Sequence, residues 1–156
     1  AFSDQLYKFE VRDINNDGLN ELVSIWLAGF STYYEKLFIF AYDGTKFNRI
    51  NPIKKDDEKI GDTDFIGFDD SGRLYKAKKF ALQDLDGDRI DEVIVEDVVP
   101  TKVDPNLPLN ESILEADLLT IVYKWNGKEF YIWKTVRESK QEYQERVEKG
   151  MELPPL

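Results

Sequence analysis

The chain of 156 residues contains no cysteine and no histidine. Because thiolates and imidazoles are the common zinc ligands, this absence excludes zinc sites of those types. It also excludes Ser–His and Cys–His nucleophile pairs, since no imidazole is present to act as the base. Without cysteine, the redox compartment cannot be inferred from disulfides.

Long apolar runs and positive charge are also scarce. No apolar segment approaches the roughly 20 residues of a membrane-spanning helix, so we expect no membrane insertion. The chain has 31 acidic residues against 21 basic ones, which gives a formal net charge of −10. A surface this negative repels phosphate backbones, so nucleic acid is not an expected partner. The same excess of carboxylates is what sites for hard cations require.

The remaining composition favours strands. Apolar residues make up 42% of the chain and aromatic residues 13%. Phe and Tyr occur mainly in runs with Val, Ile and Thr, which suit a pleated sheet better than a helix. The length is sufficient for one ordinary domain with a hydrophobic core. We therefore expect a single all-β domain over residues 1–156.

An internal repeat organises the chain. Residues 9–23 have a counterpart 71 residues later, at 80–94, and both copies contain an acidic turn between apolar segments. Downstream, residues 38–47 match residues 121–130 at an offset of 83. Each of these matching segments contains an Asx-Gly pair between β-rich runs, which is a strong hairpin signal. The two repeats are predicted to span about 5–53 and 73–137.

Each repeat is predicted to contain four strands. In chain order these lie near 6–12, 20–29, 36–42, 46–51, 73–83, 91–99, 115–125 and 129–136. Three prolines between Val99 and Ser112 predict a surface loop. A capping box at Ser139–Glu142 and a glycine at 150 predict a short C-terminal helix over about 140–149.

The two acidic turns present oxygen-bearing side chains at alternating positions, an arrangement suited to calcium, which takes six to eight oxygen ligands. In the first turn the candidate ligands are Asp13, Asn15, Asp17, the backbone carbonyl of Leu19, and Glu21. In the second turn they are Asp84, Asp86, Asp88, the backbone carbonyl of Ile90, and Glu92. We predict two Ca²⁺ sites. The second turn has four carboxylates against three in the first, so we predict that it binds calcium more tightly; Arg89 in that turn argues slightly the other way.

An EF-hand does not explain these turns. That loop needs a bidentate Glu at its twelfth position and helices on both sides. The twelfth position here is Ser24 in one copy and Val95 in the other, and the flanking residues are β-branched and aromatic. A solvated hairpin is the simpler alternative, because Asp, Asn and Gly favour turns for backbone reasons alone. Two copies in register favour calcium over that alternative.

The pattern D-x-[DN]-x-D-G-x-x-[DE], followed by apolar residues, resembles the FG-GAP/VCBS repeat of integrin α-chains and many secreted bacterial proteins. The resemblance implies propeller-like blades that hold calcium in the hairpin between their first strands. Arg89 departs from the pattern, because Gly is usual there, so we expect a positive φ at Arg89 that costs free energy and that Gly87 eases. Glu21 and Glu92 stand where Asp is commoner. Two repeats are too few to close a propeller ring, so we expect two blade-like sheets packed face to face.

The expected function is that of a calcium-binding module, secreted or in the cell envelope, with structural ions and no catalytic activity. The neighbouring acids Glu96-Asp97 are poorly placed for glycosidase chemistry, because adjacent residues on a strand point to opposite faces. Asp69-Asp70 is set aside because it lies in a predicted turn. Adhesion or ligand display through residues 30–35 and 99–112 is expected, with an unknown protein or glycan as partner. The alternative is a carbohydrate-binding module or an accessory domain of a larger secreted enzyme. Its candidate aromatic platform is Trp26, Tyr33, Tyr34, Trp125 and Trp133.

Overall fold

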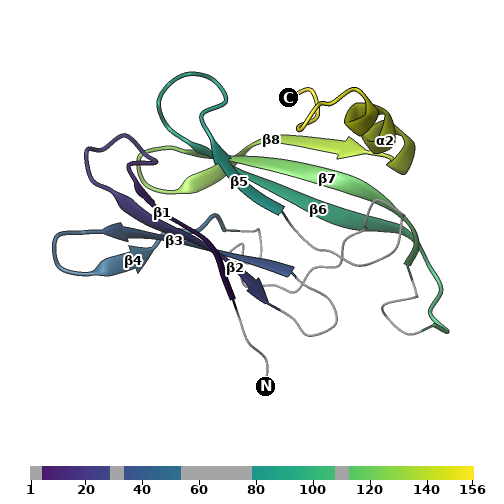
Figure 1. Ribbon diagram of the computed structural model, residues 1–156, viewed down its shortest axis with the longest axis horizontal. Coiled ribbons are helices and arrows are strands. Elements are labelled where there is room, and N and C mark those ends of the chain that lie inside the picture. The colour runs from purple at the N-terminus through teal and green to yellow at the C-terminus, as the bar shows by residue number, and fades with distance from the viewer. Residues whose placement is uncertain (1–4, 29–33, 54–78, 108–112) are drawn as a thin grey trace.

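Two four-stranded antiparallel sheets make up most of the computed structural model (Figure 1), which describes residues 5–28, 34–53, 79–107 and 113–156. Sheet 1 contains β1 (Gln5–Arg12), β2 (Glu21–Ala28), β3 (Tyr34–Tyr42) and β4 (Phe47–Arg49). Sheet 2 contains β5 (Lys79–Gln83), β6 (Glu92–Val103), β7 (Ile113–Trp125) and β8 (Phe130–Glu138). Strands follow one another in chain order within each sheet, and the helix α2 (Lys140–Glu148) comes last. The predicted all-β fold with a short C-terminal helix is confirmed.

Strand bounds differ from prediction chiefly at β6. The sequence predicted that this strand ends at 99 and that a proline-rich loop follows, but β6 continues to Val103. Pro100 pairs with Ala116 of β7, and the register then shifts between Pro100 and Lys102. Such an irregularity accommodates a residue that lacks a backbone N–H donor. The predicted linker and the strand residues 73–78 lie outside the described residues.

The hydrophobic core lies between the two sheets. In sheet 1, the register places Val23 opposite Ile39 and Ile25 opposite Leu37, and all four side chains are buried. In sheet 2 the inward-facing side chains are those of Phe80, Leu82, Val93, Val95, Ile121, Tyr123, Trp125 and Phe130. These side chains belong to the same apolar cluster as those of sheet 1, so the sheets pack face to face as the sequence predicted.

The sheet faces that meet in the core are not equivalent ones. Val23 faces the core in sheet 1, but its counterpart 71 residues later is Ile94, whose side chain points away from sheet 1. Conversely, Val93 faces the core, and its counterpart Leu22 points outward. The two sheets therefore stack front to back, so that one face of the first repeat packs against the opposite face of the second. The helix α2 and the C-terminal segment lie over part of the outer face of sheet 2 (Figure 1).

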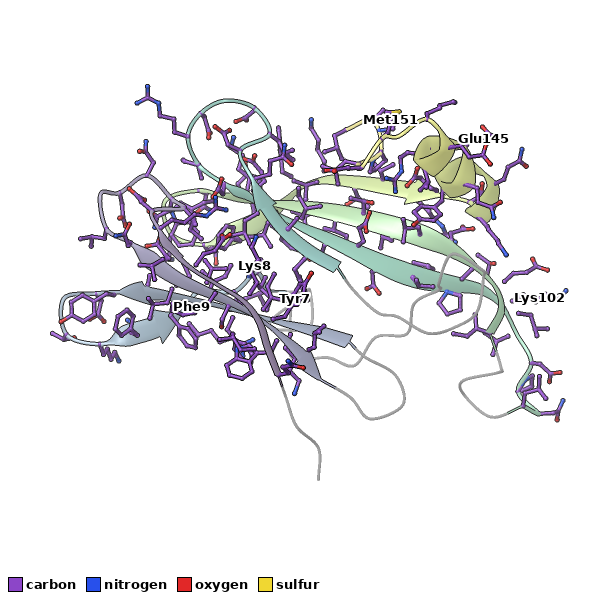
Figure 2. All side chains as sticks on the ribbon, in the orientation of Figure 1. Tyr7, Lys8, Phe9, Lys102, Glu145 and Met151 are labelled. Carbon is purple, nitrogen blue, oxygen red and sulfur yellow. The ribbon has the colours of Figure 1, made fainter. Side chains whose placement is uncertain are left out.

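The outer face of sheet 1 carries large apolar side chains that stay exposed. Phe9 is 55% exposed, and Val11 and Phe47 are each 53% exposed; Figure 2 shows Phe9 on the surface of this sheet. Phe38 lies on the same face, and the Arg49 guanidinium lies 4.6 Å from its ring centroid. In the second repeat, the corresponding face is buried against sheet 1. The outer face of sheet 1 thus carries apolar side chains like those of a core face, but it is exposed to solvent.

The helix α2 is held to sheet 2 by its cap and by one buried arginine. The Ser139 hydroxyl accepts a hydrogen bond from the Glu142 N–H at 3.3 Å, and the Glu142 carboxylate accepts one from the Ser139 N–H at 2.7 Å. Buried Arg146 donates from Nε to the Glu138 carboxylate at 2.8 Å, and from its guanidinium to the carbonyls of Met151 and Glu152. Within the described part of the chain, no helix is long and apolar enough to span a membrane.

Candidate metal sites in the two acidic turns

The two acidic turns join the first pair of strands in each sheet and share one backbone geometry. In the first turn, φ is 58° at Asn16 and 87° at Gly18. In the second, it is 81° at Gly87 and 71° at Arg89, the positions 71 residues further on. Each turn therefore has two residues in the left-handed conformation. The glycine is the second of these residues in the first turn and the first of them in the second turn. Arg89 adopts the unfavourable φ that the sequence predicted.

The first acidic residue of each turn fixes the backbone of that turn. The Asp13 carboxylate accepts hydrogen bonds from the N–H of Asp17 at 3.2 Å and of Gly18 at 2.9 Å. In the second turn, the Asp84 carboxylate accepts hydrogen bonds from the N–H of Gly87 at 2.7 Å and of Arg89 at 3.0 Å. These bonds hold the side chains of each turn in a defined arrangement without a metal.

A buried glutamate closes each turn. Glu21 is 1% exposed, and its Oε2 accepts a hydrogen bond from the Ile14 N–H at 3.0 Å. Glu92 is fully buried, and its Oε2 accepts one from the Leu85 N–H at 2.7 Å. The other oxygen of Glu92, Oε1, is buried and has no hydrogen-bond partner in the described structure. Each turn therefore has a carboxylate withdrawn from water at the same structural position.

Burial raises the pKa of both glutamates above the ordinary value. For Glu21, the hydrogen bond from Ile14 opposes this shift, while the nearby Asp17 and Asp13 carboxylates add to it. For Glu92, the hydrogen bond from Leu85 opposes it. Keeping these groups ionised near neutral pH therefore costs free energy unless a positive charge compensates.

The carboxylates converge more closely in the second turn than in the first. One oxygen each from Asp84, Asp86 and Asp88 lies within 4.8 Å of the others, an arrangement that could hold a metal ion. In the first turn, which is fully described, no three carboxylates come together in this way. Asn15 takes the place of the middle carboxylate there, and its Nδ2 donates to Asp17 Oδ2 at 3.1 Å.

A lysine that the sequence analysis did not single out lies in the second turn. Lys124, on β7, forms ion pairs with Asp86, with Asp88 Oδ2 at 2.7 Å and with Glu92 Oε1 at 3.4 Å. The hydrogen bonds that Lys124 donates to Asp86 and Asp88 raise the pKa of Lys124, and the bond to Asp88 lowers the pKa of that carboxyl group. At the repeat offset of 83, Lys124 aligns with Ala41. This difference between the two repeats is the one feature of the sequence that distinguishes the position.

The two turns are neighbours in space, although they are 71 residues apart in sequence. The Asp91 N–H donates to the Ile14 carbonyl at 2.8 Å, and the Arg12 guanidinium pairs with the Asp91 carboxylate at 2.8 Å. Figure 1 shows the β1–β2 and β5–β6 connections at the same end of the molecule. The ten predicted ligands thus belong to two neighbouring turns, and the structure brings together the carboxylates of three of them, Asp84, Asp86 and Asp88.

The donor set of each turn fits calcium. Carboxylate, amide and backbone carbonyl oxygens are ligands that calcium accepts together, and no softer ligand is offered. The buried, unbonded Oε1 of Glu92 is an oxygen for which a cation would be a partner. In the first turn, the two oxygens of Asp17 and the Oδ1 of Asn15 would contribute beside Glu21.

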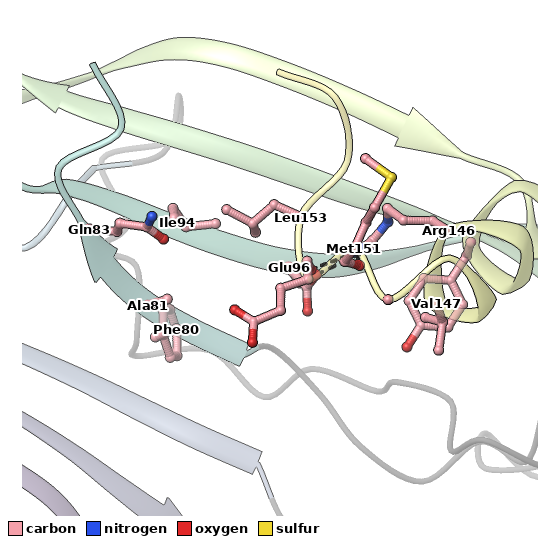
Figure 3. Close-up of a pocket in the computed structure, with 12 residues that line it drawn as sticks. Phe80, Ala81, Gln83, Ile94, Glu96, Arg146, Val147, Met151 and Leu153 are labelled. Atoms are coloured by element: carbon pink, nitrogen blue, oxygen red, sulfur yellow. Dashed lines mark hydrogen bonds and ion pairs between the residues drawn. The ribbon is translucent and has the colours of Figure 1, made fainter. Parts of the chain in front are cut away.

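A pocket of ≈ 580 Å³ lies between α2, the C-terminal segment and strands β5 and β6 (Figure 3). Its lining includes Phe80, Ile94, Val147 and Leu153. Its charged side chains Arg146 and Glu96 lie 3.6 Å apart and face each other. Arg146 also pairs with Glu138 at 2.8 Å, so its charge is already compensated within the protein.

The aromatic residues predicted as a sugar platform do not share one face. Trp26 lies on the outer face of sheet 1, where its Nε1 donates to the Ser24 hydroxyl at 3.1 Å. Trp125 packs edge-on against Phe130 with ring centroids 5.0 Å apart, beside the core. Trp133 lies on β8 of sheet 2. Tyr33 is outside the described residues, and the side chain of Tyr34 is not described.

Comparison of the chain with protein-family models, with curated proteins and with solved structures gave no match. The resemblance to FG-GAP/VCBS repeats stays a prediction from the motif and the doubled turn.

Proposed function

We propose that the chain is a calcium-binding β-repeat module in which each acidic turn holds one structural ion. The observation that carries this proposal is the pair of buried glutamates, Glu21 and Glu92, at equivalent positions beside other carboxylates. A buried carboxylate is costly without a compensating charge. Lys124 supplies such a charge to Glu92, whereas no ion pair reaches Glu21 from the described residues, and both turns offer the oxygen ligands that a hard divalent cation prefers. A solvated hairpin has no need of a carboxylate withdrawn from water.

The proposed ligands are those the repeat pattern indicates. In the first turn they are Asp13, Asn15, Asp17, Glu21 and the carbonyl of Leu19. In the second they are Asp84, Asp86, Asp88, Glu92 and the carbonyl of Ile90. An ion bound by the native state alone stabilises that state by mass action. Each turn connects the first two strands of its own sheet. Bound ions would therefore stiffen the end of the molecule at which the two turns are neighbours.

The module is proposed to act outside the cell, in adhesion or ligand display and without catalysis. The motif resemblance supports this location, and extracellular calcium modules commonly bind with dissociation constants of roughly 10⁻⁴ to 10⁻³ M. The loops proposed for partner contact, 30–35 and 99–112, fall partly outside the described residues.

One observation favours the alternative of a carbohydrate-binding module. Phe9, Tyr42 and Phe47 are exposed on or beside the outer face of sheet 1, and exposed aromatic rings can stack on sugar rings. A glycan array probed with the wild-type chain and with Phe47→Ala distinguishes the two. Binding that is lost in the variant supports the alternative, and absence of glycan binding leaves the calcium module with another kind of partner.

Thermal unfolding tests the calcium function. The chelator-stripped protein is melted with EDTA, with CaCl₂ and with MgCl₂. We expect calcium to raise Tm more than magnesium does at equal concentration, because magnesium requires near-octahedral geometry and sheds water reluctantly. The Glu21→Gln variant keeps an acceptor for Ile14 but loses the charge, so we expect a smaller calcium-dependent rise. Equal melting curves in EDTA and calcium contradict the proposal.

A further inference from the structure

The geometry points to Lys124 as a tethered cation that competes with calcium for the second turn, so that the first turn binds calcium more tightly. This inference rests on the proposed calcium function and adds a residue that sets the order of the two sites. It reverses the order expected from the number of carboxylates alone.

The Lys124 ammonium group lies among the proposed calcium ligands of the second turn. Its side chain is 15% exposed, and its Nζ forms ion pairs with three of the proposed ligands, Asp86, Asp88 and Glu92. An ammonium group has three donors and no acceptor, so it can serve three carboxylates together. The Nζ also lies 5.0 Å from the ring centroid of Trp133, a contact that favours a cation.

The surroundings of Glu92 are a separate observation that favours a positive charge at the position of the Lys124 ammonium group. Its Oε1 is buried without a hydrogen-bond partner, and it forms an ion pair with the Lys124 Nζ at 3.4 Å, which is longer than a charged hydrogen bond. The lysine therefore compensates the turn without satisfying all of its oxygens. A calcium ion that uses these oxygens has to displace the ammonium group first.

Among the residues that the structure describes, no lysine forms an ion pair with Asp13, Asp17 or Glu21 of the first turn. Trp125 pairs with Phe130 across the second Asx-Gly hairpin, as Tyr42 pairs with Phe47 across the first. The residue before Trp125 is Lys124, and the residue before Tyr42 is Ala41. A methyl group cannot reach the ligands or carry charge. The same position in the two repeats thus supplies a competing cation to one turn only.

Calcium titration by calorimetry tests the inference one site at a time. Glu21→Gln is used as the background in which the second turn is the remaining site. In it, Lys124→Met removes the ammonium group and retains the apolar stem. Lys128→Met is the matched control, since it makes the same charge change on the exposed hairpin that follows β7. We expect Lys124→Met to tighten binding at least about tenfold, which corresponds to about 1.4 kcal/mol, and Lys128→Met to change it far less.

The reverse substitution gives a second test that does not depend on the stability of Lys124→Met. In the Glu92→Gln background the first turn is the remaining site, and Ala41→Lys places a lysine at the position equivalent to Lys124. We expect this variant to weaken calcium binding to the first turn.

The outcomes separate the inference from the function on which it rests. Calcium binding with equal affinities in Lys124→Met and Lys128→Met, and no weakening by Ala41→Lys, refutes the competing lysine and leaves the calcium function intact. Absence of binding heat in the wild-type chain and in every variant refutes the calcium function, and the inference with it.

Discussion

Replacing Glu21 with Gln is expected to stabilise the metal-free protein. Glu21 is 1% exposed, and its carboxylate has Asp13 and Asp17 as neighbours, which raise its pKa further beyond the effect of burial. Gln keeps an acceptor oxygen for the Ile14 N–H, now 3.0 Å from Oε2, and removes the charge. We expect the variant to be more stable than wild type at pH 7 in the absence of metal, because a buried charge without an ion-pair partner is removed.

The pH dependence has a defined sign. Because the folded-state pKa of Glu21 is raised, the native protein binds this proton more tightly than the unfolded chain does. Stability from protonating Glu21 is fully present below the unfolded pKa and is lost as the pH rises through the folded pKa. The advantage of the Gln variant should therefore be largest at neutral pH and disappear toward pH values below the ordinary glutamate pKa.

Urea unfolding in EDTA, measured at several pH values, checks this prediction. For a chain of this size, about 1 kcal/mol corresponds to a shift in Tm of roughly 2–4 °C, so melting curves serve as a second measure. Glu129→Gln is the control, because Glu129 is exposed on a hairpin. A Glu21→Gln variant that is less stable than wild type at pH 7 in EDTA refutes the reasoning that the buried charge is a cost.

Substitutions at four further residues test the structure without a measurement of ligand binding. Arg89→Gly should stabilise the protein by about 0.5–1 kcal/mol, because φ at Arg89 is 71°, and Arg89→Ala should not; urea unfolding distinguishes them. Arg146→Ala should lower stability by about 3 kcal/mol, because it leaves buried Glu138 unpaired. Arg137→Ala breaks an exposed ion pair and should cost at most about 1 kcal/mol in the same assay. Asn51→Ala should cost about 2–3 kcal/mol in thermal unfolding, because the buried Asn51 amide bonds one backbone N–H and one carbonyl of β3.

The repeat made most of the architecture predictable from sequence. The acidic turns and the Asx-Gly hairpins fix where strands end, and the doubled pattern gives two sheets with the same strand order. Arg89 was correctly predicted to carry a positive φ because it aligns with Gly18. The capping box at Ser139 likewise fixed the start of α2, since its side-chain and backbone partners are close in sequence.

The sequence did not reveal which face of each sheet enters the core. In β2 and β6, apolar residues occupy successive positions, such as Leu22 with Val23 and Val93 with Ile94, so neither face is marked by alternation. The front-to-back stacking of the sheets is set by the tertiary structure.

Lys124 was missed for a related reason. It is 38 residues from Asp86 in sequence, and only the pairing of β7 with β6 brings them together. An estimate of metal affinity from the carboxylate count of one turn omits any cation that another strand contributes.

The most direct test of calcium binding is equilibrium dialysis of the chelator-stripped protein against labelled calcium, from micromolar to millimolar concentration. We predict one bound ion per acidic turn in the wild-type chain at saturation. Loss of one ion is expected in Glu21→Gln and loss of both in the double variant Glu21→Gln with Glu92→Gln. Retention of no more calcium by the wild-type chain than by the double variant contradicts the proposed function, and the turns are then acidic hairpins that hold the sheets without a metal.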